Sequence, residues 1–150
     1  MTVGIPREIY LNERRVSLTP QNAQLLLKKG FQRVLVERNA GAEAQFLDEA
    51  YSAAGATLVS KEEVYGGSDI LLKVRPPTVE VGGKPGEIDL IKKGSTLISF
   101  LYPAQNKAIV EALVQRNITA FAMDLIPRIS RAQVFDALRF SFTSLMSEFT

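Results

Sequence analysis

The chain contains no cysteine, no histidine and no tryptophan among its 150 residues. Without a thiolate or an imidazole it has no means of building a Cys- or His-ligated zinc site, a cysteine nucleophile, a Ser-His-Asp triad or a histidine general base. Proton transfer would therefore fall to Asp, Glu, Lys or Tyr. A disulfide-stabilised secreted fold is excluded as well, because it requires cysteine.

Long apolar runs and an excess of one charge are also missing. No stretch approaches the roughly 20 apolar residues of a membrane-spanning helix, so we expect no direct membrane span. Residues 1–8 contain no apolar region typical of a signal peptide. The 18 basic and 16 acidic side chains leave a formal net charge of only +2, which does not indicate a nucleic-acid-binding surface. With 46% hydrophobic residues, the composition is that of one globular domain.

Strand-like and helix-like segments alternate along the chain. Apolar and β-branched runs predict strands at 3–5, 34–36, 57–59, 69–74, 96–101 and 118–123. Thr19 followed by Pro20 predicts a capped helix that ends before Gly30. Further helices are expected at 48–54, 61–65 and 108–116. Residues 78–87 are rich in glycine and proline, and we expect them to form a solvated surface loop.

This alternation predicts an α/β fold built on an open, doubly wound, mostly parallel sheet of the Rossmann-like or flavodoxin-like kind. Ligands of such sheets bind beyond the carboxyl ends of the strands. That rule selects the loops after Ile5, Val74, Leu101 and Met123, which are rich in polar side chains.

The loop after the first predicted strand carries two adjacent arginines, Arg14 and Arg15, beside Glu13. A guanidinium binds a carboxylate or a phosphate through two hydrogen bonds, so Arg15 is a candidate for an anion clamp. The alternative is a solvated loop in which the ion pairs neutralise one another.

Two further candidates follow the fourth and fifth predicted strands. Lys73 lies inside the apolar run 70–74, and an ammonium within a buried strand is costly unless it reaches a partner or a ligand. Arg75 lies two positions further on and points the same way by strand alternation. Tyr102 precedes Pro103, and its hydroxyl is a candidate to bind a ligand; the alternative is a tyrosine that closes the edge of the core.

The segment after the sixth predicted strand is the most suggestive of binding. We expect Ser130 to cap a helix through Asp136, which places Gln133 and Asp136 three residues apart near its start, with Arg128 in the approach. A helix start favours an anion, and an amide with a carboxylate can hydrogen-bond a ribose or a carboxamide. An ordinary capped helix is the alternative. No Gly-x-Gly-x-x-Gly follows any predicted strand, so the chain lacks a pyrophosphate-binding loop of its own.

Taken together, these segments resemble a known family. From Val3 to Leu138 the chain is similar, in register, to the start of the NAD-binding α subunit of proton-translocating NAD(P) transhydrogenases. The first domain of that subunit belongs to the alanine dehydrogenase/transhydrogenase N-terminal domain family. The segments that carry the resemblance are Gly4–Glu8, Asn12–Val16, Thr19–Pro20, Leu72–Val74, Phe100–Asn106 and Met123–Leu138.

The resemblance implies two cofactors and several partners. NAD(H) would bind with the help of a second lobe, and NADP(H) on a partner domain would receive the hydride, coupled to proton passage through a membrane domain. Arg128, Gln133 and Asp136 would position the nicotinamide. Because hydride transfer is the cofactor's own chemistry, no catalytic side chain is expected. The NAD-binding component would be a homodimer on the cytoplasmic side of a bacterial inner membrane or in the mitochondrial matrix.

Alanine dehydrogenase shares the first loop and the segment around Lys73. In that enzyme, the resemblance implies, the residues at the positions of Arg15 and Lys73 hold the substrate carboxylate, and a histidine at the position of Tyr102 serves acid–base catalysis. Because this chain has no histidine, that mechanism is disfavoured and transhydrogenase is the better interpretation. A carboxylate-binding lobe of the dehydrogenase type and a non-catalytic interaction or dimerisation lobe remain the alternatives.

The resemblance also suggests domain boundaries. Residues 1–138 would form the first lobe, residues 139–150 depart from the family pattern, and the second, NAD-binding Rossmann lobe does not follow, so we expect the 150-residue chain to be inactive on its own. Arg139 stands where the family pattern has a serine near the nicotinamide. Asn39 replaces the first glycine of a turn, a milder change because asparagine tolerates positive φ. The apolar residues Phe142, Leu145 and Met146 have helical spacing, which indicates a final helix.

Overall fold

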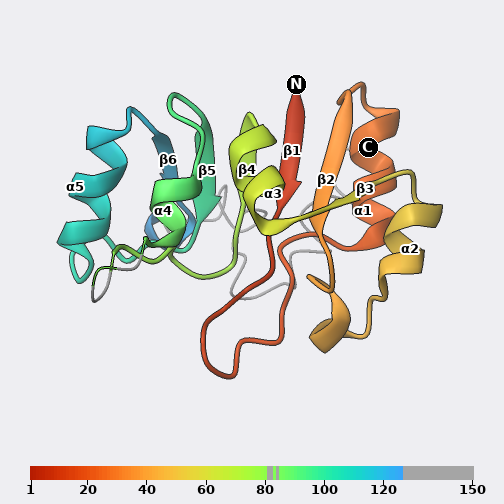
Figure 1. Cartoon of the computed structure of the whole chain (residues 1–150), viewed down its shortest axis with the longest axis horizontal. Coiled ribbons are helices and arrows are strands. Elements are labelled where there is room, and N and C mark those ends of the chain that lie inside the picture. Colours follow the sequence, from red (N-terminus) through yellow and green to blue (C-terminus); the bar gives the residue numbers. More distant parts are fainter. Residues whose placement is uncertain (81–82, 84, 127–150) are drawn as a thin grey trace.

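A computed structural model describes residues 1–80, 83 and 85–126 of the chain (Figure 1). The strands of this part form one parallel sheet in the order β3-β2-β1-β4-β5-β6, which confirms the predicted fold class. The strands are β1 (Thr2–Ile5), β2 (Arg33–Glu37), β3 (Thr57–Val59), β4 (Ile70–Leu72), β5 (Thr96–Ser99) and β6 (Thr119–Ala122). The α-helices are α1 (Pro20–Lys28), α2 (Asp48–Ala53), α3 (Lys61–Gly67), α4 (Glu87–Leu90) and α5 (Lys107–Gln115). Short 3-10 turns lie at η1 (Ala42–Ala44) and η2 (Met123–Leu125).

The start of α1 follows directly from its sequence. Thr19 is the N-cap, and its hydroxyl accepts a hydrogen bond from the Asn22 amide at 3.3 Å. Pro20 occupies the first turn, where no amide proton is needed. Gly30 follows the helix with φ of 99°, a conformation that favours glycine. The prediction of this helix is confirmed at both ends.

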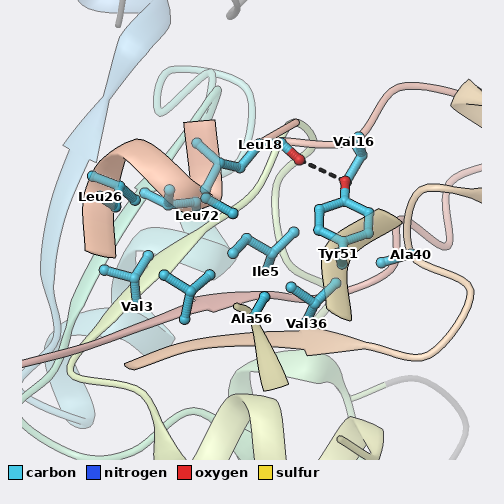
Figure 2. Packing of buried hydrophobic residues seen from close by; sticks show 12 residues of the cluster. Val3, Ile5, Val16, Leu18, Leu26, Val36, Ala40, Tyr51, Ala56 and Leu72 are labelled. Atoms are coloured by element: carbon cyan, nitrogen blue, oxygen red, sulfur yellow. Dashed lines mark hydrogen bonds between the residues drawn. The ribbon is translucent and has the colours of Figure 1, made fainter. Parts of the chain in front are cut away.

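Each face of the sheet is covered by a different set of helices. On one face, α1 and α2 pack on β1 and β2 through Ala23, Leu26 and Tyr51. Figure 2 shows this first core, in which the Tyr51 hydroxyl donates to the Leu18 carbonyl at 2.6 Å. On the other face, α3, α4 and α5 build a second core with the inner strands through Val64, Tyr65, Ile88 and Leu113. The buried phenols are structural, because each one donates to an acceptor inside the domain.

The strand order places a topological switch point between β1 and β4, from which the chain runs outward in both directions (Figure 1). At this point β1 approaches α3 closely: a Cβ added at Gly4 would lie 2.0 Å from Ser68 Oγ. A glycine is therefore required in the centre of the sheet. In doubly wound sheets the switch point opens a crevice at the carboxyl ends of the strands.

The expected solvated loop at 78–87 is wrong at its second end. Glu87 is 1% exposed, and it is joined to the partly buried Thr78 by hydrogen bonds in both directions. Glu87 also begins α4, which the glycine- and proline-rich composition concealed. The hydrogen bonds between Thr78 and Glu87 hold the two ends of this segment together.

The other predicted strands and helices of the described part are present, with ends that differ from the prediction by a few residues. The strands β4 and β5 end at Leu72 and Ser99, earlier than their apolar runs do. Asn39 adopts φ of 61°, as expected for an asparagine in place of a turn glycine. The predicted helix from Ser130 to Asp136 lies outside the described residues. No helix within the described part is long and apolar enough to cross a membrane.

Candidate functional site

A cavity of about 500 Å³ lies at the carboxyl edge of the sheet, between the segments that follow β1, β4 and β5. Its lining combines two tyrosines, one arginine, two amides and a few apolar side chains: Tyr10, Arg75, Pro76, Pro77, Thr78, Val79, Tyr102, Gln105, Asn106 and Ile109. This is the edge that the sequence selected, and it adjoins the switch point between β1 and β4. We call this cavity the crevice.

Tyr102 lines the crevice from the segment after β5, in a backbone conformation with φ of 48° that is uncommon for a non-glycine residue. The Asp124 carboxylate stabilises this turn, because it accepts hydrogen bonds from the Leu101 amide at 2.6 Å and the Tyr102 amide at 3.0 Å. The ring of Tyr102 stacks near that of Phe100, with 6.4 Å between the centroids. Asp124 lies just after β6, so this contact ties the exits of β5 and β6 together.

Arg75 lines the crevice from the segment after β4. Its Nε donates to Glu13 at 2.6 Å, and its guanidinium lies over the ring of Tyr10, 5.3 Å from the centroid. Such a cation–π contact adds to the ion pair in holding the guanidinium. The side chain is 36% exposed, so Arg75 is both oriented and accessible to a ligand.

Glu13 links Arg75 to the second arginine of the site. Both carboxylate oxygens of Glu13 accept hydrogen bonds from Arg15, each at 2.7 Å. The hydrogen bonds from Arg15 are the main reason that the pKa of Glu13 falls to about 2, and the same contact raises the pKa of Arg15. One carboxylate thus forms ion pairs with two guanidiniums. Arg15 itself is 55% exposed and lines an adjoining cavity of about 560 Å³.

The adjoining cavity lies between the loop after β1 and the segment after β2. Glu37, at the end of β2, accepts a hydrogen bond from the Arg7 amide at 2.8 Å, and burial raises the pKa of its carboxyl. Charges of both signs line this cavity, and the Arg15–Glu13 ion pair at its edge is of the kind expected for a self-neutralising loop.

Lys73 lies inside the domain and lines neither cavity. Its ammonium is 1% exposed and forms ion pairs with Glu8 at 3.3 Å and with Glu87 at 3.0 Å. It also lies 3.5 Å from the Tyr65 hydroxyl, which donates to Glu87. The two carboxylates compensate the cost of burying the Lys73 ammonium. Lys73 thus faces the interior, whereas Arg75, two residues further on, lines the crevice.

Glu8 connects this buried cluster to the crevice. Its carboxylate accepts hydrogen bonds from the amides of Val74 at 2.7 Å and Arg75 at 3.3 Å, and so holds the backbone from which the Arg75 side chain projects. Burial raises the pKa of Glu8, while Lys73 and the two amides oppose that rise. We call Lys73, Glu8, Glu87 and Tyr65 the buried lysine cluster. Through Glu8, which lines the adjoining cavity, this cluster supports the backbone at the edge of the site.

The sequence did not indicate Glu87, Tyr65 or Asp124 as parts of this arrangement. A buried lysine does signal that carboxylates must lie nearby, but it does not say which ones, because Glu87 comes from a distant segment. Arg128, Gln133 and Asp136 lie outside the described residues. Within the described residues no group of three or more acidic side chains is placed to hold a metal ion.

Comparisons with known proteins place these features in one family. The family model "Alanine dehydrogenase/PNT, N-terminal domain" matches residues 4–144. The chain is 44% identical over 138 residues to the NAD(P) transhydrogenase subunit alpha of Haemophilus influenzae, a match that covers 92% of the chain and 25% of that subunit. It is 34% identical over 126 residues to the alanine dehydrogenase of Bacillus subtilis, covering 84% of the chain and 32% of that enzyme.

A solved structure agrees with the sequence matches. The crystal structure of transhydrogenase from Sinorhizobium meliloti superimposes with a TM-score of 0.83 at 33% identity, covering 92% of this chain and 39% of that one. The chain thus spans well under half the length of each relative that it matches. The resemblance found in the sequence is confirmed, and the chain belongs to the alanine dehydrogenase/PNT N-terminal domain family.

Proposed function

We propose that this chain is the first lobe of the NAD(H)-binding component of an NAD(P) transhydrogenase, and that it positions the nicotinamide for hydride transfer from NADH to NADP⁺. The observation that carries the proposal is the 44% identity to a transhydrogenase subunit alpha across 92% of the chain. A crevice at the switch point of the sheet, where doubly wound folds bind their ligands, supports it.

The lining of the crevice fits the nicotinamide end of a dinucleotide. Tyr10 and Tyr102 offer aromatic faces, and Asn106 and Gln105 carry amides that can hydrogen-bond a carboxamide. The absence of a Gly-x-Gly-x-x-Gly in the sequence means that the pyrophosphate would be held elsewhere, on a second lobe. When the cofactor is bound, its nicotinamide supplies the hydride chemistry, and this chain's residues align and enclose it.

Arg128, Gln133 and Asp136 are our proposed nicotinamide-positioning residues. They follow Asp124 closely in the sequence, and Asp124 holds the turn at Tyr102 through the two backbone amides. A membrane domain would couple the reaction to proton passage, and an NADP-binding domain would carry the hydride acceptor. The NAD(H)-binding component would act as a homodimer. It would lie on the cytoplasmic side of an inner membrane or in the mitochondrial matrix.

A second candidate function is the binding of a small carboxylate, as in an alanine dehydrogenase-like lobe. The observation that favours it is the pair of guanidiniums, Arg15 and Arg75, that share Glu13 beside the crevice. A carboxylate ligand such as pyruvate would compete with Glu13 for one of them. Lys73, also predicted for this clamp, is paired with the buried Glu8 and Glu87, so a carboxylate ligand would have to displace one of them to reach its ammonium.

Calorimetric titration of the chain with NADH and, separately, with pyruvate distinguishes these functions. We expect no micromolar binding of NADH, because the pyrophosphate has no binding loop here, and no binding of pyruvate. Micromolar NADH binding would contradict the need for a second lobe. Pyruvate binding that is lost in Arg75→Met but kept in Lys92→Met, a change at an exposed surface lysine, would favour the carboxylate-binding lobe instead.

A further inference from the structure

Three carboxylates link neighbouring strands at the carboxyl edge of the sheet. Each accepts a hydrogen bond from a backbone amide that follows the adjacent strand. The pairs are Glu37 with Arg7 at 2.8 Å, Glu8 with Arg75 at 3.3 Å and Asp124 with Tyr102 at 3.0 Å. In every pair, the residue that donates its amide also lines the crevice or the adjoining cavity. The acidic side chains thus fix the backbone from which lining residues project.

The backbone that Asp124 holds is the unusual one of the three. Tyr102 has φ of 48°, whereas Arg7 and Arg75 lie outside the left-handed region. A non-glycine residue in that region is strained and persists only where surrounding contacts fix it. Both carboxylate oxygens of Asp124 supply such contacts, because Oδ1 accepts from the Leu101 amide at 2.6 Å and Oδ2 accepts from the Tyr102 amide.

Asn106 holds the same turn from its other end. Its side-chain amide donates to the Leu101 carbonyl at 2.9 Å, and its backbone amide donates to the Tyr102 carbonyl at 3.1 Å. Asn106 also lines the crevice, whereas Asp124 holds the turn without lining it. Asp124 is therefore placed to act on a ligand of the crevice only through the residues that it holds.

The loss of Asp124 would change the wall of the crevice. It would take from the Leu101 and Tyr102 amides the acceptors that offset the strain at Tyr102. A return of Tyr102 to negative φ would turn its Cα–Cβ bond to a new direction. The phenol would then leave its present place, where its ring stacks near that of Phe100.

We propose that Asp124 is a positioning residue, which holds the Tyr102 phenol in the wall of the crevice and so sets the place of the group that binds there. The inference rests on the proposed function for the identity of that group, which is the nicotinamide ring. Asp124 itself does not touch the ring, and its effect passes through Tyr102.

The place of the phenol can be measured in the 150-residue chain, which contains four tyrosines. After incorporation of 3-fluorotyrosine, the variant Tyr102→Phe identifies the fluorine resonance of Tyr102. Asp124→Asn should shift that resonance and leave that of Tyr51, in the first core, in place. The reason is that an asparagine turns an NH2 group, a second donor, towards one of the two backbone amides.

A second variant and a matched control accompany this measurement. Asp124→Glu keeps the charge but moves the carboxylate by one methylene, so it should shift the Tyr102 resonance as well. The control is Asp69→Asn, because Asp69 also accepts a backbone amide, that of Thr2 at 2.9 Å, and neither residue lines either cavity. The control should leave the Tyr102 resonance unchanged. An unchanged Tyr102 resonance in either folded Asp124 variant, or an equal shift in the control, would overturn the proposal.

Hydride transfer gives a second readout, in a Haemophilus influenzae subunit alpha that carries residues 1–138 of this chain. We expect Asp124→Asn and Tyr102→Ala each to lower kcat by at least about tenfold, with little change in the KM for NADH because a second lobe would hold most of the cofactor. The double variant should be no slower than the slower single variant, since both changes act through one ring.

The outcomes separate this proposal from the proposed function. Losses that multiply in the double variant, or a kcat that Asp124→Asn leaves unchanged, would overturn the positioning role. A chimera with the natural residues that transfers no hydride would count against the proposed function instead, and the fluorine resonance would still decide whether Asp124 holds Tyr102.

Discussion

The buried lysine cluster permits the sharpest test of the physical account. Lys73→Met removes an ammonium that contacts both Glu8 and Glu87, and leaves two carboxylates in an apolar interior. Methionine fills much the same volume, so the change acts mainly through charge. Removing one partner of a buried ion pair costs about 3–5 kcal/mol. We therefore expect the free energy of unfolding to fall by about that amount near neutral pH.

The loss should depend on pH in a defined direction. The pKa of Glu8 is already raised above its ordinary value of 4.5 by burial, and without Lys73 it should rise further. The folded variant then binds a proton that the unfolded chain releases above 4.5, so its stability falls as the pH rises from 4.5 through the folded-state pKa. The deficit relative to the natural chain should be largest at about pH 8 and smallest at about pH 5.

Urea unfolding monitored by circular dichroism at the two pH values measures this effect. The matched control is Lys92→Met, which breaks an ion pair with Asp69 of 2.7 Å in which both side chains are more than 40% exposed. That change should cost far less than Lys73→Met at either pH, because solvent screens an exposed ion pair. Equal losses in the two variants, or a Lys73→Met deficit that does not change with pH, would refute the reasoning.

Three smaller perturbations test other parts of the structure. Thr19→Ala removes the cap of α1 and should lower the free energy of unfolding by about 1 kcal/mol in urea; no loss would mean that the hydroxyl does not cap the helix. Gly4→Ala places a methyl group against Ser68 and should cost about 1–3 kcal/mol in the same assay, with partial recovery in Gly4→Ala/Ser68→Gly. Glu13 has a pKa of about 2 against an ordinary 4.5, so the stability it contributes is present above pH 4.5 and is lost as the pH falls from 4.5 to 2. Glu13→Gln should therefore flatten the acid limb of a stability-against-pH curve, and an unchanged slope would contradict the ion pairs with Arg15 and Arg75.

The features that the sequence predicted correctly depend on local patterns. The cap at Thr19, the positive φ of Asn39 and the alternation of strands and helices need only neighbouring residues or a repeating period. The position of the crevice at the carboxyl edge also followed, because parallel strands bring their ends to one edge.

The features that the sequence concealed depend on distant contacts. Lys73 was recognised as unusual, yet whether its charge would meet a ligand or internal carboxylates depended on Glu87, a residue hidden in a glycine- and proline-rich segment. The turn at Tyr102 depends in the same way on Asp124 from the end of another strand. Local patterns carry no information about such partners, because the fold alone brings them together.

A chimera tests the proposed function most directly. Residues 1–138 of this chain would replace the matching lobe of the Haemophilus influenzae transhydrogenase subunit alpha, to which the chain is 44% identical, and hydride transfer from NADH to NADP⁺ would be measured. The proposal predicts that the chimera transfers hydride, and that Gln133→Ala lowers kcat by more than tenfold while leaving NADH affinity nearly unchanged. The control Gln24→Ala, at an exposed position of α1 away from the crevice, should leave kcat nearly unchanged. A folded chimera that binds NADH and transfers no hydride would contradict the claim that this lobe positions the nicotinamide.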